Sequence, residues 1–163
     1  MQKRLVLLSL VSLLAACGFK LRGVAEMPRW LNHVAVVIQD AHRDLGPLLK
    51  EQLEAYNIVV VSNPAEAHYL LIVERDHNQQ QLTSVSASTT PRQYQLVYTV
   101  RFSLVKQRGP VLIPSTQVGV SRQLTVNNDR ILGSDFEEST LYNEMRRDAV
   151  MQILIRLNRK PQQ

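Results

Sequence analysis

The sequence has almost no cysteine, since Cys17 is the only one among 163 residues. A lone cysteine excludes an intramolecular disulfide, so the core has to be held by packing even in an oxidising compartment. Beyond residue 16, no stretch approaches the roughly 18 to 20 apolar residues that a membrane-spanning helix needs. The length predicts one domain with a core of ordinary size.

Sequence motifs of catalysis are also missing. The chain has no glycine-rich phosphate loop, no Gly-x-Ser-x-Gly and no His-Glu-x-x-His. The pair Asp76 and His77 would need distant partners to hold a metal, and a solvated histidine is the simpler interpretation. We therefore predict no enzyme, no cofactor and no metal site. The histidines are scattered over strand ends and loops: His33, His42, His68 and His77.

The N-terminus carries the most specific pattern, MQKRLVLLSLVSLLAAC. Lys3 and Arg4 precede the apolar run of residues 5–16, which is too short to cross a bilayer and suits a signal peptide. Small residues lead directly to Cys17, as in the bacterial lipoprotein box, which this pattern resembles. The resemblance implies that residues 1–16 are cleaved and that Cys17 is acylated, anchoring the chain to a membrane. The alternative is an ordinary secretory signal followed by a chance cysteine.

Charge and the residue after Cys17 bear on location and partners. Loss of Lys3 and Arg4 with the signal lowers the net side-chain charge from +5 to about +3, which does not argue for nucleic acid. By resemblance to enterobacterial lipoproteins, Asp at position 18 would favour the inner membrane. Gly18 is compatible with the outer membrane, where we place the protein, anchored by its lipid on the periplasmic side.

The first half of the chain predicts a βαβ unit after a connector at residues 17–33. Residues 34–39 (VAVVIQ) and 58–62 (IVVVS) are short apolar runs typical of buried strands. Between them, leucines at helical spacing predict a helix, capped by Asp44 and stopped at Asn57. The two strands are therefore expected to be parallel.

The second half predicts three long antiparallel strands and a helix. The first strand opens at Tyr69 and is expected to run on to Val85. In residues 94–105, an apolar residue stands at every second position and most residues between are polar, which predicts the second strand. In the third strand, residues 116–126, Arg122 interrupts the apolar face and is expected near an edge or paired. Ser134 and Glu137 have capping-box spacing and predict the start of the last helix. A single domain, residues 34–160, results.

The predicted fold class is α+β: a two-layer sandwich of order β-α-β-β-β-α, with a mixed, mainly antiparallel sheet and two helices on one face. The other face of the sheet is then polar. Such a face either sits in water or meets a polar partner surface. In the second case, the partner-facing residues are Gln95, Thr99, Arg101 and Gln123.

The segment CGFKLRG at residues 17–23 resembles the start of the mature LPS-assembly lipoproteins of the LptE family. The similarity extends thinly along the chain, through residues 93–95 (QYQ), 144–145 (EM) and 155–157 (IRL). It implies a small α/β sandwich without catalytic activity, which plugs and helps assemble the outer-membrane barrel LptD. Delivery of lipopolysaccharide to the cell surface follows from the same resemblance.

The resemblance also implies lipopolysaccharide binding by basic residues near the loop tips. Here Arg92 and Arg130 flank the expected loops at residues 86–91 and 127–133, and solvated loop arginines are the alternative interpretation. Two other functional hypotheses stay open: a lipid-anchored periplasmic module that binds a soluble ligand or peptidoglycan, and an envelope enzyme.

Overall fold

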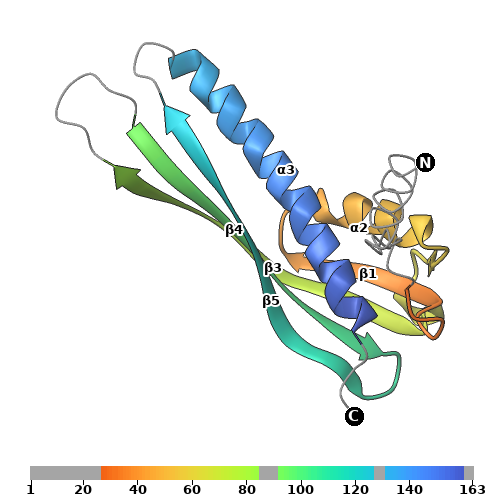
Figure 1. The fold of residues 1–163 in the computed structure, drawn as a ribbon. Coiled ribbons are helices and arrows are strands. Elements are labelled where there is room, and N and C mark those ends of the chain that lie inside the picture. The colour runs from red at the N-terminus through yellow and green to blue at the C-terminus, as the bar shows by residue number, and fades with distance from the viewer. Residues whose placement is uncertain (1–26, 85–91, 127–130, 160–163) are drawn as a thin grey trace, which may run out of the picture.

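The structure is a computed structural model and describes residues 27–84, 92–126 and 131–159. A five-stranded sheet and two helices form its two layers (Figure 1). The elements in chain order are β1 (His33–Asp40), α2 (Leu45–Ala55), β2 (Val59–Val60), the short 3-10 helix η1 (Pro64–Glu66), β3 (Tyr69–Ser84), β4 (Arg92–Lys106), β5 (Val111–Val126) and α3 (Ile131–Asn158).

The sheet is mixed, with the strand order β2-β1-β3-β4-β5. β1 is parallel to both β2 and β3, whereas the long pairs β3–β4 and β4–β5 are antiparallel. This confirms the predicted α+β class and the parallel strands of the βαβ unit. The two-residue β2 forms the outermost of the five strands, and is shorter than the apolar run at residues 58–62 that predicted it.

Helix α2 forms because its leucines share one side. Leu45, Leu49 and Leu53 are fully buried, and the helix ends before Asn57, whose backbone is left-handed with φ 61°. Asp44 does precede the helix, but its side chain makes no capping hydrogen bond. Asp44 is thus the N-cap residue by position, as predicted, but its side chain does not cap the helix.

The alternation predicted for residues 94–105 is confirmed in β4. From Leu96 to Leu104, every second residue of the strand faces the helices and is completely buried, and the intervening residues lie on the opposite face. Helix α3 covers this apolar face with residues spaced four apart, and α2 lies beside it on the same side of the sheet (Figure 1). The core contacts are made by Leu96, Tyr98, Val100, Phe102 and Leu104 of β4, and by Met145, Ala149, Ile153 and Leu157 of α3.

The start of the last helix and the start of the packed domain both differ from the prediction. Helix α3 begins at Ile131, so Ser134 lies inside the helix and does not cap it; serine costs little at an interior helical position. At the other end, Leu31 is only 2% exposed and belongs to the core. The packed domain thus includes residues that the sequence assigned to the connector.

Arg122 behaves as predicted. It lies on β5, which is an edge strand, and its guanidinium bonds the carboxylate of Asp148 on α3. The charge that interrupts the apolar face of β5 is thereby paired across the two layers.

The three long strands extend well beyond the βαβ unit (Figure 1). β1 ends where Asp40 pairs with Arg75, while β3 continues to Ser84. The chain turns away from the sheet at residues 41–44, and the main-chain N–H of His42 donates to the Asp76 carboxylate at 3.2 Å. Among the described residues, the outer half of β3 therefore pairs with β4 on one side and with no strand on the other.

Candidate functional site

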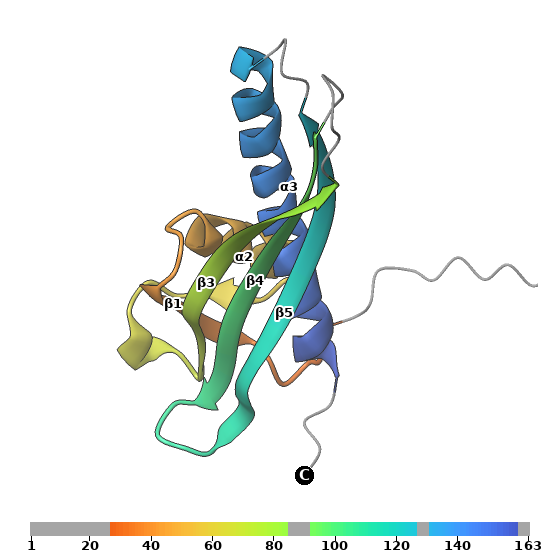
Figure 2. The same cartoon turned by 90° about the vertical axis from the view of Figure 1, so that its left-hand side faces the viewer.

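The sheet face opposite the helices, here called the open face, is covered by no described helix or strand (Figure 2). Polar side chains from β3, β4 and β5 lie across it in register. Since directly opposite residues point to the same side of a sheet, each row forms one band of surface. The rows are Arg75, Arg101 and Gln117; His77, Thr99 and Gly119; Gln79, Val97 and Ser121; and Gln81, Gln95 and Gln123.

A β-bulge at Glu74 decides which residues of β3 belong to this face. The register of β3 against β4 shifts between Val73 and Arg75, so that two residues of β3 oppose one of β4. Glu74 accepts a hydrogen bond from the Ser115 hydroxyl at 2.6 Å. This hydrogen bond, together with the nearby charge of Arg101, holds the pKa of Glu74 below its ordinary value.

Two arginines lie next to each other on the open face. Arg75 and Arg101 are directly opposite in the β3–β4 register, an arrangement that destabilises a sheet when the charges are unpaired. Each has an acidic neighbour: the Arg75 Nε is 3.4 Å from an Asp40 carboxylate oxygen, and Glu74 lies near Arg101. The centre of the open face is therefore polar and nearly balanced in charge.

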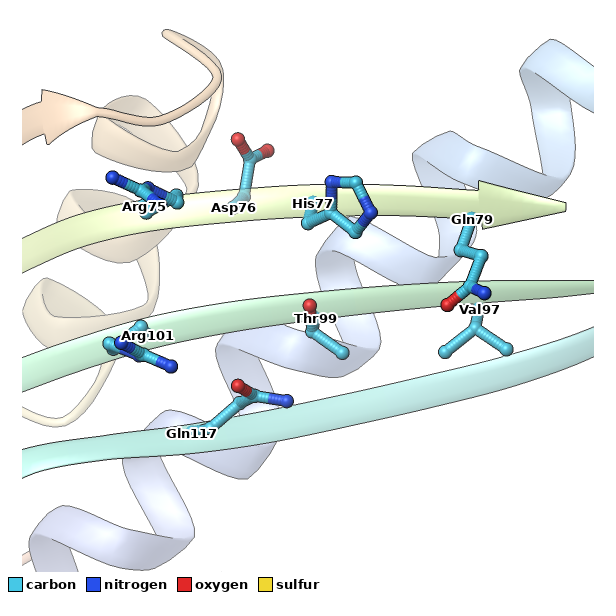
Figure 3. A pocket seen from close by; sticks show the side chains of 8 residues that line it. All are labelled: Arg75, Asp76, His77, Gln79, Val97, Thr99, Arg101 and Gln117. Carbon is cyan, nitrogen blue, oxygen red and sulfur yellow. The ribbon is translucent and has the colours of Figure 1, made fainter.

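The arginines border a depression of about 350 Å³ in the open face (Figure 3). Its surface is rich in hydrogen-bond donors, namely two guanidinium groups, an imidazole, a hydroxyl and amides. Asp76, at its border, turns to the helix side instead, where it accepts a hydrogen bond from the Tyr98 hydroxyl at 2.8 Å. The lining residues are Arg75, Asp76, His77, Gln79, Val97, Thr99, Arg101 and Gln117.

The residues predicted to face a partner all lie on the open face. Gln95, Thr99 and Arg101 alternate with buried residues of β4, and Gln123 does the same on β5. The polar residues of β3, Arg75, His77, Gln79 and Gln81, were missed by the sequence reasoning. No local signal could have found them, because residues 75–81 are all polar and the bulge at Glu74 reverses their phase relative to the apolar start of the strand.

Of the two residues predicted to bind lipopolysaccharide, Arg92 lies at one end of the sheet and Arg130 is not among the described residues. Arg92 opens β4, where its backbone pairs with Val126 at the end of β5, and Ser84 at the end of β3 pairs with Gln93. Both expected loops are thus joined to the same end of the sheet, as predicted. Arg130 and Cys17 lie outside the described residues.

Within residues 27–84, 92–126 and 131–159, no three His, Cys, Asp or Glu side chains gather as a metal site. The structure does bring two histidines together, with the ring centroids of His33 and His68 4.8 Å apart. None of the described helices is long and apolar enough to cross a membrane.

Comparison with solved structures defines the class of this fold. The solution structure of an uncharacterized lipoprotein B from Nitrosomonas europaea is similar, with a TM-score of 0.70 at 26% identity, covering 86% of this chain and 90% of that one. A minor lipoprotein from Acinetobacter baumannii has the same fold, with a TM-score of 0.67 at 22% identity over 80% of this chain and 95% of that one. The fold is thus one found among small bacterial lipoproteins.

Sequence comparison identifies the family. The LptE family, described as lipopolysaccharide-assembly, matches residues 31–157. The LPS-assembly lipoprotein LptE of Yersinia enterocolitica is 28% identical, covering 96% of this chain and 77% of that protein; its counterpart from Yersinia pestis is 27% identical over 88% and 69%. The chain belongs to the LptE family, which confirms the resemblance seen in the sequence.

Proposed function

We propose that this protein is an outer-membrane lipoprotein, anchored through Cys17, that plugs the LptD barrel, helps assemble it and takes part in delivering lipopolysaccharide to the cell surface. The observation that carries the proposal is the open face, an extensive polar sheet surface in a chain of the LptE family. No catalytic role is part of the proposal.

The open face suits the lumen of a large β-barrel because that lumen is polar. Amides and hydroxyls can exchange hydrogen bonds with water for bonds to the barrel wall at little net cost. Arg75 and Arg101 have acidic neighbours, so burying them against a polar wall leaves no isolated charge. Gln95, Thr99, Arg101 and Gln123 are the proposed contacts.

The test adds negative charge to the open face and measures copurification of LptD from detergent-solubilised outer membranes. The triple variant Arg101→Glu, Gln95→Glu, Gln123→Glu should retain its melting temperature within a few degrees, because exposed charges contribute little to stability. It should lose most of the copurified barrel, since like charges and unpaired polar groups are costly once desolvated.

A matched control places the same change of charge on exposed positions of α3, with Arg147→Glu, Ser139→Glu and Asn143→Glu. This variant should copurify the barrel normally. The reverse pattern, with loss only in the α3 variant, would assign the interface to the helix layer. Absence of any barrel with the wild-type protein would favour the periplasmic ligand-binding alternative.

Lipopolysaccharide binding by Arg92 and Arg130 is proposed from their place beside the two loops. Guanidinium groups engage phosphates through paired hydrogen bonds, so the lipid A phosphates are the expected ligands. Affinity should fall as salt rises, because the contact is ionic. The double variant Arg92→Ala, Arg130→Ala should bind more weakly with a flatter salt dependence, and equal binding to wild type would show that both arginines are merely solvated.

A further inference from the structure

In the part of the chain that the structure describes, the outer edge of β3 has no neighbouring strand. β1 pairs with β3 only from Tyr69 to Arg75, whereas β3 continues to Ser84. Among the described residues, no strand pairs with the outer side of residues 77–82, here called the β3 edge, and every side chain in it is exposed. An exposed strand edge presents main-chain donors and acceptors that another chain can use.

The β3 edge also lacks the features by which proteins protect such edges. Its sequence, HNQQQL, contains no lysine, no proline, no acidic residue and no arginine. Its pairing with β4 is regular from Arg75 to Leu82, so no bulge interrupts it. No described side chain hydrogen-bonds its backbone.

The opposite edge of the sheet, β5, has several of these features: a proline, an irregular register and side-chain hydrogen bonds to its backbone. Pro114 lacks a donor and lies where the register against β4 is irregular. The Gln152 amide donates to the Gly119 carbonyl at 3.1 Å, and the Arg122 guanidinium donates to the Ser121 carbonyl at 3.1 Å. Side chains thus already occupy acceptors along β5. The two edges differ in the way expected if only β3 is to be extended.

We propose that the β3 edge binds an extended segment of the barrel partner as a sixth strand; this rests on the proposed function. The edge is continuous with the open face, because Gln79 and Gln81 lie in the rows of Val97 and Gln95. A partner that covers the open face therefore reaches the edge as well. Main-chain hydrogen bonds supply the affinity in this mode of binding, and side chains supply the specificity.

The edge specifies the chemistry of the added strand. The β3 edge has no acidic or basic side chain besides His77, so an uncharged polar segment fits it. Leu82 is 48% exposed and lies in one row with Tyr94 and Leu124 on the helix side. An apolar side chain of the added strand next to Leu82 would continue that apolar row.

Residue-resolved amide hydrogen exchange of the free protein and of the LptD complex tests the proposal. Neighbouring residues of a strand direct their N–H groups to opposite sides. In the free protein, alternate amides of the β3 edge should exchange rapidly; in the complex these amides should become protected. The amides of residues 111–113 on β5, which lie outside the rows of the open face, provide the control and should not change.

Proline substitution gives an independent measurement. One of the variants Gln79→Pro and Gln80→Pro removes a donor to β4 and should lower the melting temperature, while the other removes a donor on the free side. The better-folded variant should bind LptD about tenfold more weakly, the change expected for losing a main-chain hydrogen bond.

The outcomes separate this inference from the proposed function. A complex that forms while the alternate amides of the β3 edge continue to exchange overturns the added strand but keeps the barrel partner. If no complex forms, both fall. Amides that are already protected in the free protein, or a dimer that the better-folded proline variant abolishes, would assign the edge to this chain's own connector or to a second copy, and would overturn the inference.

Discussion

The hydrogen bond between Tyr98 and Asp76 is a polar contact on the helix side of the sheet. The Tyr98 side chain is completely buried, and its hydroxyl donates to the Asp76 carboxylate at 2.8 Å. The other oxygen of that carboxylate accepts from the main-chain N–H of His42 at 3.2 Å. Asp76 therefore joins β3 and β4 to the turn between β1 and α2.

Tyr98→Phe removes the hydroxyl and leaves the ring in place. A hydrogen bond to a charged group contributes about 1.5–3 kcal/mol. Asp76 is half-buried and retains the His42 N–H, so water can compensate in part. We therefore expect the free energy of unfolding to fall by about 1–2 kcal/mol. Tyr98→Ala also removes the ring and should cost about 3–5 kcal/mol.

Urea unfolding at pH 7 measures these differences. Tyr94→Phe is the matched control, because Tyr94 is on the same strand and the same face, and no hydrogen bond of its hydroxyl occurs among the described residues. It should change stability by about 0.5 kcal/mol or less. A Tyr98→Phe variant as stable as Tyr94→Phe would refute the contribution of the hydrogen bond.

The same residue predicts a loss of stability in base. Burial, the hydrogen bond to Asp76 and the charge of Asp76 raise the pKa of Tyr98 above its ordinary value. An unfolded tyrosine loses its proton near pH 10, so above that pH the unfolded chain binds fewer protons than the folded one. Stability then falls as pH rises. Tyr98→Phe should therefore lose less of its free energy of unfolding as the pH rises. An unchanged dependence on pH would show that the buried Tyr98 phenol is not the cause of the loss.

The remaining predictions concern the two sheet faces, the anchor and acid stability. Val100→Ala should cost roughly 2 kcal/mol in thermal melts, whereas Thr99→Ala and Arg101→Ala should cost about 0.5 kcal/mol or less; the opposite order would contradict the assigned faces. Cys17→Ala should abolish labelling by a clickable fatty acid without changing the melt, and retained label would exclude Cys17 as the anchor. The hydrogen bond from Ser115 lowers the pKa of Glu74 in the folded protein. Ionised Glu74 therefore stabilises the fold above the pKa that glutamate has in the unfolded chain, and this stabilisation is lost as the pH falls through the pKa of Glu74 in the folded protein. Glu74→Gln should therefore reduce the fall in the free energy of unfolding at acidic pH. An equally steep fall in the variant would contradict this role of Glu74.

Much of the fold could be predicted because its local patterns are strong. The strict alternation in β4 and the spacing of leucines in α2 each reflect one buried face, so period and burial agree. Asn57 ended its helix as predicted because the left-handed backbone favours asparagine there. The start of α3 was less predictable. Ser134 and Glu137 have capping-box spacing, yet the helix already begins at Ile131, three residues before Ser134.

The candidate site was only half predictable, for a specific physical reason. The β4 and β5 residues of the open face, including Thr99 and Gln123, alternate with buried apolar neighbours that fix their direction. From Arg75 onward, β3 has no buried apolar residue to set its phase, because residues 77–83 are all exposed. Their side is determined by pairing with β4, a long-range contact that a local pattern does not contain.

The bulge at Glu74 determines which side chains of β3 lie on the open face. Val73 faces the helices, and simple alternation would direct Arg75 and His77 to the same side, where buried charge is costly. The additional residue reverses the phase, so that Asp76 reaches the Tyr98 hydroxyl while His77 lies opposite Thr99 on the open face. One bulge thus places Arg75 and His77 on the open face and aligns the polar residues of β3 with those of β4. A partner bound across Thr99 and Arg101 would therefore contact β3 too, and would reach the free edge that begins at His77.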